Sequence, residues 1–189
     1  MLTFAKKYAR NVYSQFGEDG ILEEILRRIN PEKKTAVEFG APNWEYCSNT
    51  ALLADQGWSV RMYDIDPHDP RITKTEVTTR NVTEVVGDPT VLSMDVDNDD
   101  YLLWLALETR PDVVVIEINS GVAPMSLMIP GRQGASYRSM AMLGMAKGYM
   151  LVAHTGNMIF VLEKYRDLFP EVTGDPIRDY ELYFNTMHL

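Results

Sequence analysis

The sequence predicts an α/β fold, a doubly wound and mostly parallel sheet of about seven strands with an antiparallel last strand. Short apolar runs alternate with segments of helical periodicity along most of the chain, which favours parallel strands joined by helices. The run over residues 113–118 is rich in β-branched side chains, as is typical of a central strand buried on both faces. Near the end of the chain, Gly156-Asn157 separates two apolar runs like a tight hairpin turn, which makes the last two strands antiparallel neighbours.

Length and composition predict one globular domain over residues 1–189. Of the 189 residues, 46% are hydrophobic and 24% are charged, as in an ordinary globular domain. The formal net charge of -9 argues against a nucleic-acid partner, because binding to phosphates depends on Lys and Arg. No apolar run approaches the roughly 20 residues of a membrane span, and the lone Cys47 can form no intrachain disulfide. We therefore expect a soluble, cytoplasmic protein without a membrane or nucleic-acid partner.

The first predicted elements are a helix over Glu18–Ile29 and a strand over Thr35–Phe39. In the helix, apolar residues recur at helical spacing and charged residues occupy the opposite face. Asn30-Pro31 ends this helix, because proline disfavours helical backbone in the residue before it. The strand is a short apolar run that ends at Gly40, so we expect it to be buried.

The rest of the chain continues the alternation of helices and strands. A helix over residues 48–56 is bounded by Ser48 or Asn49 as N-cap and by Gly57, and a strand follows over 58–65. Gly, Pro and Asp residues separate the later elements. These are an edge strand over 74–79, a buried strand over 90–94, a helix over 100–109, the central strand over 113–118, a helix over 135–147, and the terminal hairpin of 149–155 and 158–162.

Polar residues directly after the strands are the candidates for ligand binding, because ligands of open parallel sheets bind outside the carboxyl ends of the strands. A glycine at position 40 lets the backbone approach a ligand closely. Asp64 lies at the tip of the second strand, where a carboxylate can accept hydrogen bonds from both ribose hydroxyls. The cofactor-binding residues predicted on this basis are Glu38, Gly40, Asn43, Asp64 and Asp95.

The segment after the fourth strand is strongly acidic, with four aspartates between positions 95 and 100. Such carboxylates repel one another unless they are solvated, bound to a cation or partly protonated. Asp99 or Asp100 suits the start of the following helix, which leaves Asp95 and Asp97 as functional candidates. They can face a cationic ligand, bind Mg²⁺ or accept a proton. We predict catalytic roles for Asp95, Asp97 and His154, which ends a later strand.

Glu117 and Asn119 follow the central strand. Glu117 stands within an apolar run, where an unpaired charge is costly, so a partner or a function is expected. The two side chains project to the same side of an extended segment. Opposite Asp95 or Asp97 they can complete an oxygen-rich site for a substrate hydroxyl or a metal. The predicted ligands for Mg²⁺ are Asp97, Glu117 and Asn119.

The antiparallel end of the sheet bears on the identity of the cofactor. Nucleotide-binding domains of dehydrogenases do not usually finish in this way, whereas class I methyltransferases have an antiparallel last strand. The predicted topology therefore favours S-adenosylmethionine over NAD. Two alternatives stay open: an NAD-dependent enzyme, and a catalytically silent ligand-binding or interaction domain on the same fold.

A set of short motifs between residues 13 and 163 resembles the FkbM-type methyltransferases. They are YSQFGEDG at 13–20, VEFG at 37–40 with Asn43, Glu45 and Asn49-Thr50 behind it, LSMDVD at 92–97 with Asp100-Tyr101, VIEIN at 115–119, and GAS at 134–136 with Gly148-Tyr149. The motifs are specific as a set, whereas each alone is not.

The resemblance implies a class I, Rossmann-like fold, S-adenosylmethionine as methyl donor, and O-methylation of a hydroxyl on a sugar or another small metabolite. The acceptor is then a small molecule or a glycan. We further expect residues 1–30 to form an N-terminal helical flap from which Gln15, Glu18 and Asp19 contact the substrate. The chain departs from the family at Pro42-Asn43, in place of a glycine-rich continuation. A homodimer is compatible with the sequence.

Overall fold

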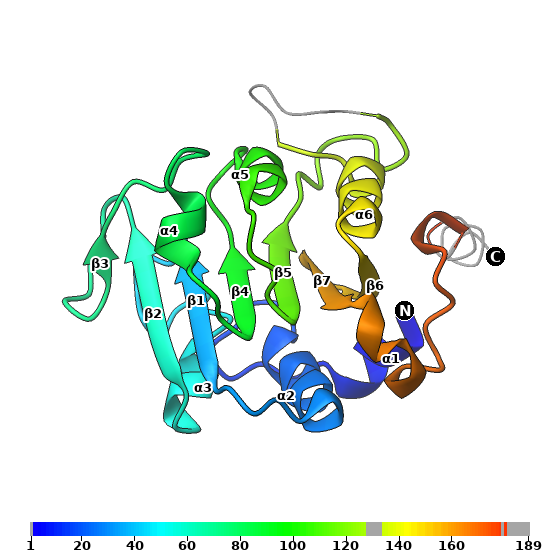
Figure 1. Ribbon diagram of the computed structural model, residues 1–189, viewed down its shortest axis with the longest axis horizontal. Helices are drawn as coiled ribbons and strands as arrows, with labels where there is room; N and C mark the ends of the chain where they lie inside the picture. Colours follow the sequence, from blue (N-terminus) through cyan, green and yellow to red (C-terminus); the bar gives the residue numbers. More distant parts are fainter. Residues whose placement is uncertain (1, 128–133, 179, 181–189) are drawn as a thin grey trace.

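The described strands form one sheet (Figure 1). The computed structural model describes residues 2–127, 134–178 and 180. The strands are β1 (Thr35–Phe39), β2 (Ser59–Asp64), β3 (Thr73–Lys74), β4 (Val91–Met94), β5 (Val113–Glu117), β6 (Tyr149–His154) and β7 (Asn157–Leu162). Their order across the sheet is β3-β2-β1-β4-β5-β7-β6. β1 to β5 pair in parallel, whereas β7 is antiparallel to both β5 and β6, which confirms the predicted fold class.

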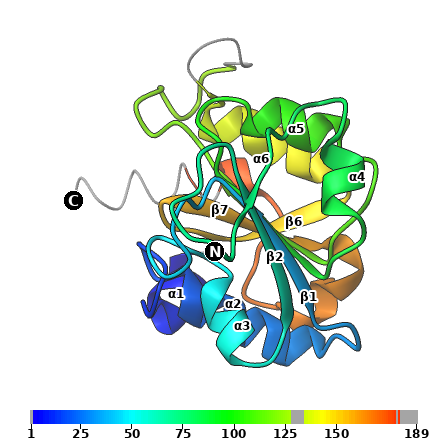
Figure 2. The ribbon, with the colours of Figure 1, turned by 90° about the vertical axis from the view of Figure 1, so that its left-hand side faces the viewer.

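Helices cover both faces of the sheet, as Figure 2 shows, with α1, α2 and α3 on one side and α4, α5 and α6 on the other. They are α1 (Leu2–Tyr8), α2 (Glu18–Ile29), α3 (Ala51–Asp55), α4 (Val82–Val86), α5 (Asp100–Ala106), α6 (Tyr137–Ala146) and the 3-10 helix η1 (Glu163–Leu168). No helix among the described residues is both long and apolar enough to span a membrane.

The core has two layers, because successive residues of a strand face opposite sides of the sheet. In β1, Val37 and Phe39 face the layer of α4 to α6, and Ala36 faces the layer of α1 to α3. On α2, Ile21 and Ile25 are fully buried in that second layer. The expected flap over residues 1–30 is therefore corrected: α1 and α2 pack against the sheet, since their apolar faces need that burial, and only the loop between them reaches the site.

Some elements differ from the sequence prediction. The bounds of α2 and β1 agree with it, but the edge strand spans only Thr73–Lys74. The predicted helix over 48–56 begins at Ala51, because the residues before it bind a buried carboxylate. α1 and α4 were not predicted, since helices of 7 and 5 residues carry little periodic signal.

Replacing Gly144 by alanine tests the packing of α6 on the sheet. A Cβ on Gly144 would lie 2.4 Å from Cε1 of Phe160, a fully buried ring that cannot move aside. Overpacking of this kind costs about 1–3 kcal/mol and outweighs the gain in helix propensity of up to ~1 kcal/mol. We expect Gly144→Ala to lower the free energy of unfolding by about 2 kcal/mol in urea denaturation. Met142→Ala, at an exposed position of the same helix, serves as the control; equal stability of the two variants contradicts the packing.

Candidate functional site

The strand register aligns the predicted site residues at one edge of the sheet. Phe39 pairs with Tyr63 and with Met94, and Met94 pairs with Ile116. The residues that follow these four are Gly40, Asp64, Asp95 and Glu117. Because parallel strands run in the same direction, these four residues form a row at the carboxyl ends of the strands. Strand order reverses between β1 and β4, which is the place where ligands of open α/β sheets bind.

Gly40 lies in close contact with the residue that follows β4. Its φ of 86° lies in the left-handed region, and a Cβ on it would lie 1.4 Å from the carbonyl oxygen of Asp95. The Asp95 amide donates to the carbonyl of Phe39 at 3.1 Å, which holds the two strand ends together. Only glycine fits this arrangement, so the glycine predicted for close backbone approach serves first the contact between two strands.

A first cavity of about 460 Å³ opens beside this contact. Its volume lies in the range of small-molecule sites, roughly 300–1,000 Å³. Its lining combines carboxylates with apolar side chains and includes Gly40, Pro42, Asp64, Ile65, Val77 and Asp95. The cavity therefore offers an apolar slot with an acidic rim. Of the predicted cofactor-binding residues, Gly40, Asp64 and Asp95 are brought together here.

A second cavity of about 490 Å³ lies on the β5 and β7 side. Its lining includes Gln15, Phe16, Asp95, Asp97, Glu117 and Asn119. Asp95 and Asp97 line both cavities, so they stand at the junction between them. The sequence predicted that these two aspartates, Glu117 and Asn119 would share a site, and the structure brings them together.

Three carboxyl groups of the second cavity hold protons more tightly than usual. Burial raises the pKa of Glu117 to about 8, and the charges of Asp95 and Asp100 add to the rise. Burial also raises the pKa of Asp95, which shares a side-chain hydrogen bond with Glu117. Burial raises the pKa of Asp100 to about 7, although it accepts a hydrogen bond from the Val96 amide at 3.0 Å. The raised pKa of Glu117 therefore favours a protonated carboxyl group in this hydrogen-bonded pair near neutral pH.

Glu38 does not face either cavity. Its buried carboxylate accepts hydrogen bonds from the Ser48 hydroxyl at 2.6 Å, the Asn49 amide at 2.8 Å and the Thr50 hydroxyl at 2.5 Å. Burial raises its pKa, and these donors oppose the rise. The predicted cofactor role is corrected: Glu38 points to the opposite face of the sheet and fixes the loop before α3. Asn43 is half-buried in that loop and lines neither cavity.

Glu18 and Asp19 are also buried rather than facing a substrate. Asp19 Oδ2 accepts hydrogen bonds from three successive backbone amides, those of Val12, Tyr13 and Ser14, at 2.7–2.8 Å. Glu18 accepts from a backbone amide at position 16 and from the hydroxyl at position 155. Both carboxylates therefore shape the loop before α2, and its next residues, Gln15 and Phe16, reach the second cavity.

His154 is turned away from the predicted site. Its ring makes an edge contact with Tyr137 on α6, with centroids 5.2 Å apart, and it lines neither cavity. Burial lowers its pKa to about 4, so the imidazole is neutral at physiological pH. The predicted catalytic role of His154 is corrected, because its strand position places the ring beneath α6.

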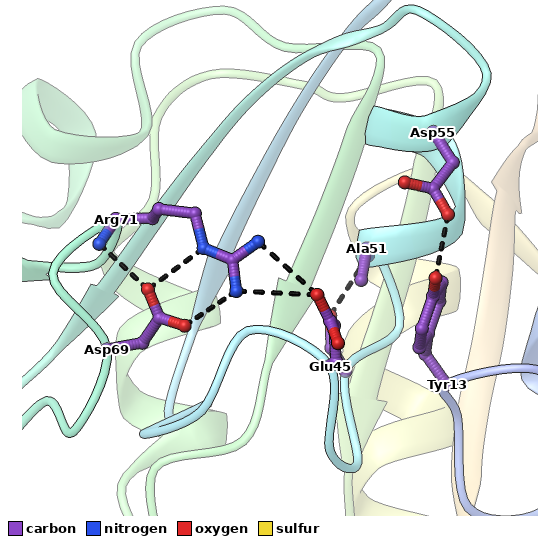
Figure 3. A network of polar contacts seen from close by, with 7 residues as sticks. Tyr13, Glu45, Ala51, Asp55, Asp69 and Arg71 are labelled. Carbon is purple, nitrogen blue, oxygen red and sulfur yellow. Dashed lines mark hydrogen bonds and ion pairs between the residues drawn. The ribbon is translucent and has the colours of Figure 1, made fainter.

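Arg71 joins the two loops that wall the first cavity, as Figure 3 shows. Its guanidinium donates to Asp69 at 2.9 and 2.6 Å and to Glu45 at 3.4 and 3.5 Å. It also lies 4.8 Å from the ring centroid of Trp44. The side chain of Arg71, in the loop after β2, therefore helps to hold the loop after β1 in place. A glycine-rich loop could instead fold through backbone contacts alone.

The predicted magnesium ligands are not preassembled. No group of three or more His, Cys, Asp or Glu side chains within the described part of the chain is arranged to hold a metal ion. Asn119 Oδ1 accepts a hydrogen bond from the Gly121 amide at 2.7 Å, and Glu117 is hydrogen-bonded to Asp95. These contacts occupy oxygens that a metal would need, so the residues present do not fit Mg²⁺ as they stand.

A comparison of this chain with protein-family models finds no match, and neither does a comparison with curated protein sequences.

Glu117→Gln tests the shared proton through the pH dependence of stability. Because the folded state raises the pKa of Glu117 from 4.5 to about 8, the folded protein binds more protons than the unfolded chain between these values. This group's contribution to stability is therefore largest at low pH and is lost as pH rises through that window. We expect Glu117→Gln to raise the midpoint of thermal unfolding at about pH 9 and to flatten its fall with pH. Glu108→Gln, at an exposed site, is the control; identical profiles for the two variants contradict the pairing.

Proposed function

We propose that this protein is an S-adenosylmethionine-dependent methyltransferase that methylates a hydroxyl of a small molecule or a glycan. The observation that carries the proposal is the antiparallel β7 placed between β5 and β6, at the end of an otherwise parallel sheet with a ligand-sized cavity at its switch point. Class I methyltransferases end their sheet with an antiparallel strand. Three of the motifs that resemble the FkbM type, VEFG, LSMDVD and VIEIN, lie at the ends of β1, β4 and β5. We further propose that the enzyme acts in the cytoplasm, without a nucleic-acid partner.

The first cavity suits the methyl donor. In this proposal, Asp64 accepts hydrogen bonds from the ribose hydroxyls, and Ile65 and Val77 contact the adenine, since all three line this cavity. Asp95, at the junction of the two cavities, supplies a negative charge near the sulfonium. An acidic lining favours a ligand whose reacting atom carries a positive charge, and it disfavours the pyrophosphate of a dinucleotide.

The second cavity suits the acceptor. When bound, the donor supplies a methyl group on a positively charged sulfur, which leaves as a neutral thioether. The acceptor hydroxyl oxygen forms a bond to the methyl carbon while the carbon–sulfur bond breaks, and the hydroxyl proton must leave. In this proposal, the carboxylate of the Asp95–Glu117 pair that carries no proton takes the proton of the acceptor hydroxyl. The remaining residues orient the acceptor and exclude water.

The two rival functions make different predictions. An NAD-dependent enzyme on this fold would be favoured by a last strand parallel to the rest, whereas β7 is antiparallel. A catalytically silent domain would bind S-adenosylmethionine without consuming it. Formation of S-adenosylhomocysteine with a panel of hydroxylated acceptors separates that alternative from the proposal.

Calorimetric titration with S-adenosylmethionine tests the proposal directly. We expect measurable binding by the wild type and a loss of about tenfold or more in Asp64→Asn, because the amide loses a charged acceptor of the ribose hydroxyls. Asp88→Asn, an exposed carboxylate before β4, is the control and keeps wild-type affinity. An absence of heat with the wild type at millimolar ligand would sink the proposal.

Removing Arg71 tests whether the two loops hold the donor cavity in shape. Exposed ion pairs contribute only ~0.2–1 kcal/mol each, so we expect little change in unfolding temperature. Loosening both loops should nonetheless weaken S-adenosylmethionine binding by Arg71→Ala severalfold. Arg71→Lys should recover only part of the affinity, because lysine lacks the planar fork. Arg80→Ala, an exposed arginine further along the chain, is the control; equal affinity in Arg71→Ala and Arg80→Ala contradicts the role.

A further inference from the structure

The aromatic ring of Phe16 is exposed to solvent at the edge of the second cavity. Its side chain is 53% exposed, although it lies among elements that bury most of their large apolar residues. Among the described residues that line this cavity, Phe16 is the aromatic one, and carboxylates such as Asp95 and Glu117 supply much of the rest. Because the ring borders the cavity and is not buried in the core, it is available to contact a ligand bound there.

The backbone that carries Phe16 is fixed from both sides. The Phe16 amide donates to Glu18 Oε2 at 2.8 Å, and Glu18 Oε1 accepts a hydrogen bond from the hydroxyl of Thr155. Glu18 is fully buried at the start of α2, and Thr155 lies in the turn between β6 and β7. The backbone of Phe16 is therefore held beside this turn by a carboxylate that binds both segments.

Gly156 lies in the same turn, and because it has no side chain it leaves room for the ring of Phe16. A Cβ on Gly156 would lie 2.2 Å from Cδ2 and 2.4 Å from Cε2 of Phe16. The backbone of Gly156 is not in the left-handed region, so its conformation alone does not require glycine. The backbone at position 156 would therefore allow alanine, but the added Cβ would collide with the ring of Phe16.

We propose that Phe16 is a specificity-determining residue, a platform on which a ring-shaped acceptor stacks its flat C–H face, and that Gly156 seats this platform. This inference depends on the proposed function, because it assigns the shape of that enzyme's acceptor. Aromatic faces favour stacked, flat partners. The hydroxyl edge of such a ring then meets the carboxyl groups of Asp95 and Glu117, which line the same cavity. An open-chain polyol presents no flat face and loses more conformational freedom when it binds.

Saturation-transfer NMR on the protein saturated with S-adenosylhomocysteine tests the platform. The probes are the methyl pyranosides of glucose, galactose, mannose and rhamnose, with sorbitol as the open-chain control. We expect at least one pyranoside to receive saturation on the C–H protons of one ring face, and sorbitol to bind more weakly. Phe16→Ala should weaken binding of that pyranoside about fivefold or more, and Phe16→Trp should retain it.

Gly156→Ala provides an independent arm, because it displaces the ring without removing it. We expect it to weaken pyranoside binding as Phe16→Ala does, while both variants keep wild-type affinity for S-adenosylhomocysteine. Val12→Ala, an exposed apolar residue of the same loop outside the cavity lining, is the matched control. Wild-type pyranoside binding in Phe16→Ala, equal losses for sorbitol, or no saturation transfer to any pyranoside overturns the inference. A wild type that binds no S-adenosylmethionine overturns the proposed function instead, so the two failures are distinguishable.

Discussion

The contact between the ends of β1 and β4 is the constraint on which the site depends. Gly40 comes so close to the carbonyl oxygen of Asp95 that any side chain would separate the two strands. This contact lies where strand order reverses, and one cavity opens on each side of it. Asp95 lines both cavities for that reason. Under the proposed function, a donor on one side and an acceptor on the other would then meet beside this carboxylate.

The buried carboxylates divide into two groups according to the donors around them. Glu38 and Asp19 are surrounded by backbone amides or hydroxyls, and each shapes a neighbouring loop. Glu117 and Asp95 are hydrogen-bonded to each other and line a cavity. Burial close to other carboxylates raises the pKa of both. A carboxylate that accepts several hydrogen bonds from the loop beside it serves to fix that loop. One with a carboxyl neighbour and a cavity keeps a proton to exchange.

The loop after β1 shows how a departure from a glycine-rich pattern is accommodated. Pro42 lines the first cavity, and its carbonyl accepts a hydrogen bond from the His68 amide at 2.8 Å. Arg71 adds contacts to Glu45 and Trp44. The loop after β1 is therefore held in place by contacts with the loop after β2. A glycine-rich loop would not need these contacts, because glycine can fold into a tight turn by itself. The sequence alone does not single out Arg71. Its neighbours in the chain form a turn rich in Asp and Pro, and they give no sign that its side chain contacts Glu45 in another loop.

The sequence by itself determined the α/β class, the order of the strands along the chain, and the strand ends at which Gly40, Asp64, Asp95 and Glu117 lie, because apolar periodicity and turn residues are local signals. It left α1 and α4 unseen, since helices this short carry little periodicity. Only the tertiary structure decided which polar residues face a cavity. Glu38 and Asp95 are both acidic residues at strand ends; the fold surrounds one with donors and places the other between two cavities. Phe16 likewise acquires its position from Gly156, which is 140 residues away in the chain but in contact with it in space, and no local pattern encodes such a pairing.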